Sequence, residues 1–214
     1  MARLRFHISI SLDGFVAGPN QSEQNPLGEG GMQLHQWVFG LAAWRRSHGL
    51  DGGEVNASTD IVEASLRNIG ATVMGRNMFG GGGGPWGDTP WDGWWGADPP
   101  FHMPVFILTH HPREPVLMQG GTTFTFITDG VRSALEHARH AAAGKDVALA
   151  GGADVAQQFL RAGLIEELQL HLVPVLLGDG ARLFDNLDGA QVGLEATGTV
   201  QAPGVTHLSY RVLT

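Results

Sequence analysis

The sequence predicts an α/β domain built on a mostly parallel sheet with an antiparallel edge. Short apolar or alternating segments typical of strands recur along the 214 residues, and segments of helical periodicity lie between them. The last two strand-like segments, residues 192–200 and 205–212, follow each other closely and predict an antiparallel pair. Strands that alternate with helices and end in a hairpin are typical of this fold class. One domain is expected over residues 1–214, since domains usually contain about 100 to 200 residues.

The first third of the chain is expected to hold one strand, a loop and two helices. Residues 4–10 alternate apolar and polar side chains and predict a strand, and the stretch 18–31, which contains glycine and proline, predicts a surface loop. Apolar residues at helical spacing predict an amphipathic helix over residues 32–47. A second, short helix is expected over residues 61–68, because N-cap residues precede it and a glycine follows it.

Two short apolar runs in the middle of the chain, residues 71–75 and 105–109, have the length of buried strands. Between them, residues 80–100 carry five consecutive glycines and four of the six tryptophans. A connection of that length is typical of a lid or a binding loop. Its tryptophans favour either an aromatic substrate pocket or a subunit contact. The GxGxxG match within residues 82–87 is rejected as a dinucleotide motif, because it does not lie between a strand and a helix.

The remaining elements are expected in the order strand, helix, strand, helix and strand. They cover residues 122–128, 131–142, 147–150, 153–162 and 167–173.

Composition excludes several classes of function. The net charge is −8, from 21 acidic and 13 basic residues without a basic run, which argues against a nucleic-acid partner. No apolar stretch approaches the roughly 18 to 20 residues that span a bilayer, so we expect a cytoplasmic protein without a membrane partner. The absence of cysteine removes disulfides and thiolate chemistry, and the ten histidines show no metal-ligand spacing, so no metal site is expected.

The unit of strand, double glycine and helix over residues 147–162 is the most informative part of the sequence. Gly151 and Gly152 allow the backbone to approach a ligand closely, and the free N–H groups of a helix N-terminus suit a pyrophosphate. A plain tight turn is the alternative. Arg76, directly after a predicted strand, is either a partner for a cofactor phosphate or a solvated loop arginine. On the motif alone, the plain turn is slightly favoured over a dinucleotide site.

Five segments, residues 9–18, 73–76, 105–109, 151–152 and 164–180, together resemble the dihydrofolate reductase superfamily. Within it, they most resemble the C-terminal reductase domain of riboflavin biosynthesis proteins and its stand-alone relatives. The resemblance implies a three-layer fold with a mostly parallel, eight-stranded sheet and an antiparallel C-terminal hairpin. It also implies a homodimer, with NADPH lying across the carboxyl ends of the strands.

The resemblance further implies which residues meet NADPH. The nicotinamide side would involve Ser9, Val16, Ala17 and Gly18. The adenosine phosphates would meet Gly75, Arg76, Asn77 and Met78, and the adenine end would meet Thr109 and His110. The pyrophosphate would be held by Gly151, Gly152, Ala153, Asp154 and Val155.

The proton donor and the substrate contacts are less closely defined. Relatives use a carboxylate near the short second helix or beside the substrate, and here Asp60 and Glu63 compete for that role. Asp13 either faces the substrate or caps a turn. His171 falls at a substrate-side position of a strand, with a half-buried structural histidine as the alternative, and Trp86 is a further candidate for the substrate pocket.

The function expected from this resemblance is an NADPH-dependent reductase of a small heterocyclic, Schiff-base or carbonyl substrate, similar to 5-amino-6-(5-phosphoribosylamino)uracil reductase. No phosphoribosyl clamp is evident, which leaves that substrate open. A dihydrofolate reductase is one alternative, and a non-catalytic, dimeric dinucleotide-binding protein of the same fold is the other.

Overall fold

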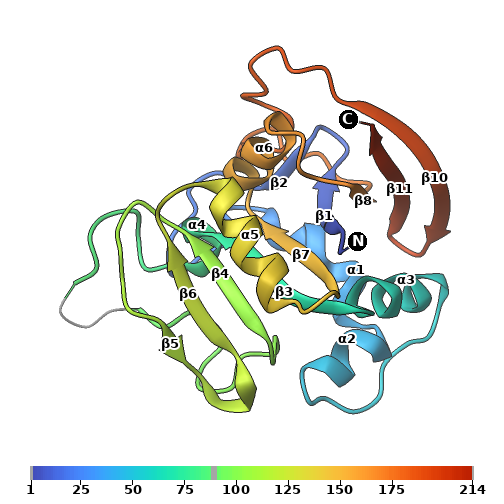
Figure 1. Cartoon of the computed structure of the whole chain (residues 1–214). Helices are drawn as coiled ribbons and strands as arrows, with labels where there is room; N and C mark the ends of the chain where they lie inside the picture. Colours follow the sequence, from blue (N-terminus) through green and yellow to red (C-terminus); the bar gives the residue numbers. More distant parts are fainter. Residues whose placement is uncertain (1, 88–90, 214) are drawn as a thin grey trace.

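The computed structural model describes residues 2–87 and 91–213. Nine strands form its central sheet (Figure 1). Their spatial order is β10 (Gly193–Ala202), β11 (Val205–Leu213), β8 (Glu167–Val173), β1 (Leu4–Ser11), β7 (Asp146–Gly151), β3 (Ile69–Gly75), β4 (Pro104–Leu108), β6 (Thr123–Ile127) and β5 (Val116–Leu117).

The six strands from β8 to β6 run parallel, and the antiparallel strands lie at the two ends of the sheet. The predicted C-terminal hairpin is formed by β10 and β11, and β11 pairs antiparallel with β8. The fold class is therefore confirmed, but the expected count of eight strands is wrong. The ninth strand, β5, is a two-residue edge strand paired with β6, too short to produce a periodic signal in the sequence.

Helices flank the sheet on both faces (Figure 1). The α-helices are α1 (Gln36–Phe39), α2 (Ala42–Ser47), α3 (Ala57–Leu66), α4 (Arg76–Phe79), α5 (Val131–Ala141) and α6 (Ala153–Arg161). Two 3₁₀ turns, η1 (Gly31–His35) and η2 (Gln119–Gly121), and a small sheet of β2 (Phe15–Ala17) and β9 (Ala181–Arg182) complete the fold. No helix in the described ranges is long and apolar enough to cross a membrane.

Two helix predictions need correction. The helix expected over residues 32–47 is divided into η1, α1 and α2, because Leu41 is extended and the backbone around it bonds to Glu54. The second helix begins earlier than expected, at Ala57 instead of residue 61. Asn56 and Thr59 form a reciprocal capping box at this earlier position, which satisfies two backbone N–H groups of the first turn.

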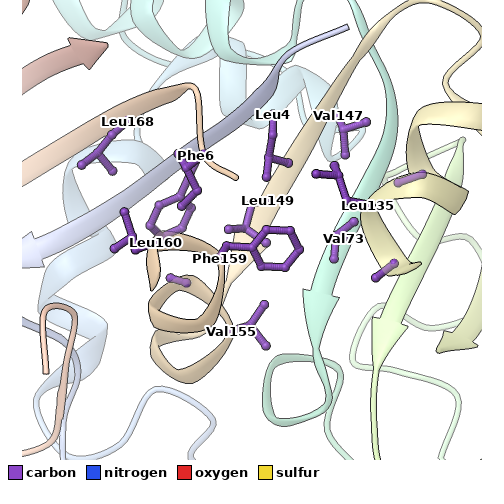
Figure 2. Packing of buried hydrophobic residues seen from close by; sticks show 14 of the residues in the cluster. Leu4, Phe6, Val73, Leu135, Val147, Leu149, Val155, Phe159, Leu160 and Leu168 are labelled. Atoms are coloured by element: carbon purple, nitrogen blue, oxygen red, sulfur yellow. The ribbon is translucent and has the colours of Figure 1, made fainter. Parts of the chain in front are cut away.

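The main core lies between the sheet and the helices α5 and α6. Figure 2 shows Phe6 of β1 and Leu149 of β7 beside Phe159 of α6. All three are at most 1 % exposed. Burying a side chain of this size stabilises the fold by about 1.5–3 kcal/mol, so this layer fixes the position of α6 at the end of β7.

The opposite face of β1, β8 and β11 is polar. Residues with odd numbers on these strands point away from the main core, towards α1 and α3, and they form three cross-strand rows. The rows are Arg5–Glu167–Arg211, His7–Gln169–Ser209 and Ser9–His171–His207. In the first row Arg5 forms an ion pair with Glu167, and in the second the amide of Gln169 donates to the hydroxyl of Ser209.

Candidate functional site

A cavity of about 690 Å³ lies at the carboxyl ends of the central parallel strands. In open α/β sheets this edge is where ligands bind. Twelve of the fifteen residues expected to meet the cofactor line the cavity: Val16, Ala17, Gly75, Arg76, Asn77, Met78, Thr109, His110, Gly152, Ala153, Asp154 and Val155. The topology thus brings together side chains that are far apart in the sequence. Their contact with a cofactor stays a prediction.

The other three expected cofactor residues do not line the cavity. The buried hydroxyl of Ser9 accepts a hydrogen bond from the indole of Trp37. Gly18 packs against the backbone of Glu29 so closely that a Cβ atom would lie 1.8 Å from its carbonyl oxygen. Gly151 is the last residue of β7, where a φ of +113° favours glycine.

The N-terminus of α6 points its unsatisfied N–H groups towards the cavity. Gly152 is the N-cap, and the next three residues, 153–155, are among the first N–H groups of the helix, which have no partner within it. The positive end of the helix dipole lies at the same place. At Gly75, a Cβ atom would lie 2.6 Å from Cγ2 of Val155, so only glycine lets β3 approach α6 this closely. The arrangement is suited to a pyrophosphate.

Arg76 lies at the wall of the cavity, 7 % exposed, and is held in place by its neighbours. Its guanidinium donates to the carbonyl oxygens of Gly80 and Gly81 at 3.1 and 2.8 Å and lies 3.1 Å above the ring of Trp86. The guanidinium of Arg113 approaches the same ring at 4.8 Å. Burial, with a smaller effect of Arg113, lowers the pKa of Arg76 to about 10. Within the described ranges, no carboxylate forms an ion pair with Arg76.

The tryptophan loop, residues 80–100, folds back onto α4. The indoles of Trp91 and Trp94 donate to the carbonyl oxygens of Phe79 and Met78, at 2.8 and 2.9 Å. Trp94 and Trp95 line the cavity, whereas Trp86, the predicted substrate contact, lies between Arg76 and Arg113 and not in the cavity lining. Residues 88–90 of this loop lie outside the described residues.

The three carboxylates considered as proton donors do not line the cavity. Asp60 is exposed on α3, and Glu63 pairs with Arg46 at 3.4 Å on the surface. Asp13 accepts hydrogen bonds from the Ser11 hydroxyl and from two backbone N–H groups of the loop after β8. The Ser11 hydroxyl is the main reason why the pKa of Asp13 falls to about 2, which makes it a poor proton donor near neutral pH.

The sequence interpretation missed two histidines, one that lines the cavity and one that contacts the predicted site residue His171. His35 of η1 lines it directly. His171 was expected at a substrate-side position, and the structure places it in a buried cluster with His207 of β11, whose Nδ1 lies 2.8 Å from Nδ1 of His171. Burial, followed by the effects of neighbouring histidines, lowers the pKa of His171 to about 2. The alternation of polar and apolar residues in β8 and β11 could have indicated that both histidines lie on a polar face. The sequence did not indicate the register that places them opposite each other.

Comparison with known proteins adds an independent finding. The model of the family described as the RibD C-terminal domain matches residues 2–208. The uncharacterized protein YwjB of Bacillus subtilis is 31 % identical over 86 residues, which are 40 % of this chain and 48 % of YwjB. The match therefore spans about half the length of that curated relative.

Solved structures share the fold over the whole chain. A Shewanella sp. PV-4 protein provisionally assigned to riboflavin biosynthesis superposes with a TM-score of 0.64 at 21 % identity, covering 100 % of both chains. The yeast riboflavin biosynthesis reductase Rib7 gives 0.55 at 12 % identity, covering 100 % of this chain and 89 % of Rib7. Dihydrofolate reductase from Enterococcus faecalis, complexed with NADP(H), gives 0.51 at 13 % identity, covering 98 % and 96 %. These identities show the fold alone.

Proposed function

Because the chain belongs to the RibD C-terminal domain family, we propose that it is an NADPH-dependent reductase of a small heterocyclic, Schiff-base or carbonyl substrate. NADPH would supply the hydride. The protein would hold the nicotinamide against the substrate and exclude water, which is the main contribution that a protein makes to hydride transfer.

The residues around the cavity fit such a cofactor. The free N–H groups at the start of α6 would bind the pyrophosphate, and the close approach of β3 and α6 at Gly75 keeps the backbone accessible there. The small apolar residues Val16 and Ala17, from β2, would contact the nicotinamide.

The observation that carries the proposal is the charge of Arg76. Arg76 is 7 % exposed, a buried positive charge is costly without a counter-ion, and no described carboxylate pairs with Arg76. The guanidinium of Arg113, on the same tryptophan ring, adds to the positive potential. A phosphate group in the cavity would pair with Arg76, and the 2′-phosphate distinguishes NADPH from NADH. We therefore infer a preference for NADPH.

A titration with NADPH, NADH and NADP⁺ tests this proposal, with tryptophan quenching and energy transfer to the nicotinamide as signals. We expect NADPH to bind at least about tenfold more tightly than NADH, as one charge-assisted hydrogen bond of about 1.5–3 kcal/mol allows. Arg76→Gln should remove most of this preference. Arg132→Gln, an equal change of charge at an exposed position on α5, is the matched control and should keep it.

Two outcomes would contradict the proposal. If the wild-type protein binds none of the three dinucleotides, the cavity is not a nicotinamide site. If Arg132→Gln and Arg76→Gln weaken NADPH binding equally, the preference comes from the net charge and not from Arg76. Circular dichroism of both variants establishes that they are folded, since Arg76 also supports the backbone of the tryptophan loop.

One observation favours the non-catalytic alternative. None of the three carboxylates considered as proton donors, Asp13, Asp60 and Glu63, lines the cavity. A dinucleotide-binding protein without turnover would bind NADPH as above but oxidise none of it with any acceptor. A screen of carbonyl and cyclic imine acceptors, followed at the nicotinamide absorbance, separates the two functions.

A further inference from the structure

A chain of buried polar side chains lies beside the cavity, and the cofactor does not need it. His171 and His207 are directly opposite on β8 and β11, and their Nδ1 atoms are 2.8 Å apart. On its other side, Nε2 of His207 lies 2.8 Å from Oγ of Ser58, in the first turn of α3. All three residues are at most 5 % exposed. We call this set of hydrogen-bonded residues the histidine relay.

The direction of the two hydrogen bonds in the relay follows from the single proton that the Ser58 hydroxyl and each neutral histidine ring carry. The hydroxyl of Ser58 is buried, and within the described ranges the only side-chain or backbone partner of its Oγ is Nε2 of His207. A buried hydroxyl hydrogen needs an acceptor, so Ser58 donates and Nε2 of His207 accepts. Burial lowers the pKa of both histidines and keeps them neutral. The proton of His207 is therefore on Nδ1, which donates to Nδ1 of His171.

It follows that His171 carries its own proton on Nε2. That atom has no hydrogen-bond partner among the described residues. No side-chain nitrogen or oxygen in the described part of the chain is both fully buried and without a partner, so Nε2 of His171 reaches solvent. The relay thus ends in a free N–H donor at a fixed position.

The free donor points away from His207. The two nitrogens of an imidazole lie on different edges of the ring, so a ring whose Nδ1 points to β11 directs Nε2 towards β1. His35 of η1, which lines the cavity, is near enough for its charge to act on His171. Trp37 packs on the rings of His171 and His207, at 4.9 and 5.0 Å between centroids, and restrains them both.

We propose that Nε2 of His171 donates a hydrogen bond to the substrate, and that His207 and Ser58 are positioning residues that hold His171 in the donor tautomer. This inference rests on the proposed function and narrows its substrate class. The reacting group must carry an acceptor, a carbonyl oxygen or an imine nitrogen. As the hydride forms the new C–H bond and the C=O or C=N π bond breaks, charge develops on that atom, and the neutral imidazole stabilises it. No proton leaves the relay, since solvent water protonates the heteroatom after the hydride has been transferred and the site has opened.

The tautomers can be measured without any substrate. In the full-length protein with ¹⁵N-labelled histidine, long-range ¹H–¹⁵N correlation identifies the protonated nitrogen of each ring. We expect Nδ1–H at His207 and Nε2–H at His171. Ser58→Ala removes the donor to His207, so both histidines should then populate both tautomers. Ser65→Ala is the matched control, because it removes a hydroxyl of the same helix that donates to the carbonyl of Val62. A wild-type His171 protonated at Nδ1 overturns the relay.

The contact with substrate is tested on the same labelled protein with NADP⁺ bound. Dihydrofolate serves as the imine probe and phenanthrenequinone as the carbonyl probe. A shift of the Nε2 resonance of His171 on addition of either probe is expected. If neither probe shifts it, the inferred substrate class is wrong, while NADP⁺ binding leaves the proposed function intact. If NADP⁺ itself does not bind, the proposed function fails and this inference with it.

Steady-state kinetics test the same contact. The rate of NADPH oxidation is measured with the probe that shifts the Nε2 resonance of His171. His171→Phe should lower kcat about 10²-fold, the low end of the loss seen when an oxyanion donor is removed. The Kd of NADPH should change less than about twofold, because His171 is not among the residues proposed to hold NADPH. His140→Phe, at an exposed position on α5, is the control and should keep kcat. Equal kcat values for wild type and His171→Phe would overturn the inference.

Discussion

Mild acid, at about pH 5, is expected to destabilise this protein because two of its histidines resist protonation in the folded state. Burial, and then the nearby charge of Arg5, lowers the pKa of His7 to about 4. Burial and the neighbouring histidines lower that of His171 to about 2. The ordinary value for both is 6.5. Below this pH the unfolded chain binds a proton at each ring, whereas the folded protein keeps both rings neutral until the pH is much lower.

The size of the loss in unfolding free energy follows from the difference in the number of protons bound by the unfolded and folded states. The free energy of unfolding is unaffected well above pH 6.5 and falls as the pH is lowered, because the unfolded state binds more protons. Each histidine contributes about 1.36 kcal/mol for each pH unit, so at pH 5, about 1.5 units lower, the two together cost about 4 kcal/mol. A typical domain has a total stability of about 5–15 kcal/mol. The loss is therefore a large fraction of the stability.

Urea denaturation at about pH 7.5, 6 and 5, followed by tryptophan fluorescence, measures this dependence. Replacing His7 by Gln removes one of the two rings, and the loss between pH 7.5 and 5 should fall from about 4 to about 2 kcal/mol. His140→Gln, at an exposed position on α5, should leave the loss as in the wild type. Equal losses in wild type and His7→Gln would refute the reasoning, since the buried histidines would then not be the source of the acid sensitivity.

Three further substitutions test other parts of the structure. Gly75→Ala places a methyl group 2.6 Å from Val155, so it should lower the free energy of unfolding by about 1–3 kcal/mol and weaken NADPH binding. Gly84→Ala, with no atom within 4 Å, should change neither quantity. Urea denaturation measures the stability, and the dinucleotide titration measures the binding. Phe159→Ala should cost about 3–5 kcal/mol by thermal or urea denaturation, because the fully buried ring lies in the main core. Asp13→Asn should lower the urea midpoint, because two backbone N–H groups lose a charged acceptor, yet keep the proposed reductase activity; a loss of turnover in a stably folded variant would instead place Asp13 in the reaction.

Most of the fold could be predicted from the sequence because each strand of the parallel sheet has a local signature. A strand buried on both faces has a continuous apolar run, as β3 and β4 do, and a strand buried on one face alternates, as β1 does. The residue pattern therefore predicts these strands directly. The break after α1 could not be predicted, since it depends on backbone hydrogen bonds of Gly40 and Ala42 with Glu54, which is more than ten positions further along the chain. The single domain, the homodimer and the cytoplasmic location stay predictions.

The candidate site was only partly predictable. The residues that line the cavity follow strands whose carboxyl ends must meet at one edge, so their proximity is a consequence of parallel pairing. The contact between His171 and His207 depends on the register of β11 against β8, which local patterns do not specify. Asp60 and Glu63 were chosen from the resemblance alone, and the structure leaves both on the surface of α3.

The polar rows on β1, β8 and β11 also bear on how this sheet avoids misassembly. Because side chains alternate between the two faces, a slip of one residue in β8 would turn Glu167, Gln169 and His171 into the layer around Phe159. It would also expose the leucines of β8 on the other face. A carboxylate or an imidazole transferred to that apolar layer without its partners carries a penalty of several kcal/mol. The polar residues of the rows therefore disfavour the register that is shifted by one residue. If these positions were made apolar, the strands would still pair, but their register would no longer be specified.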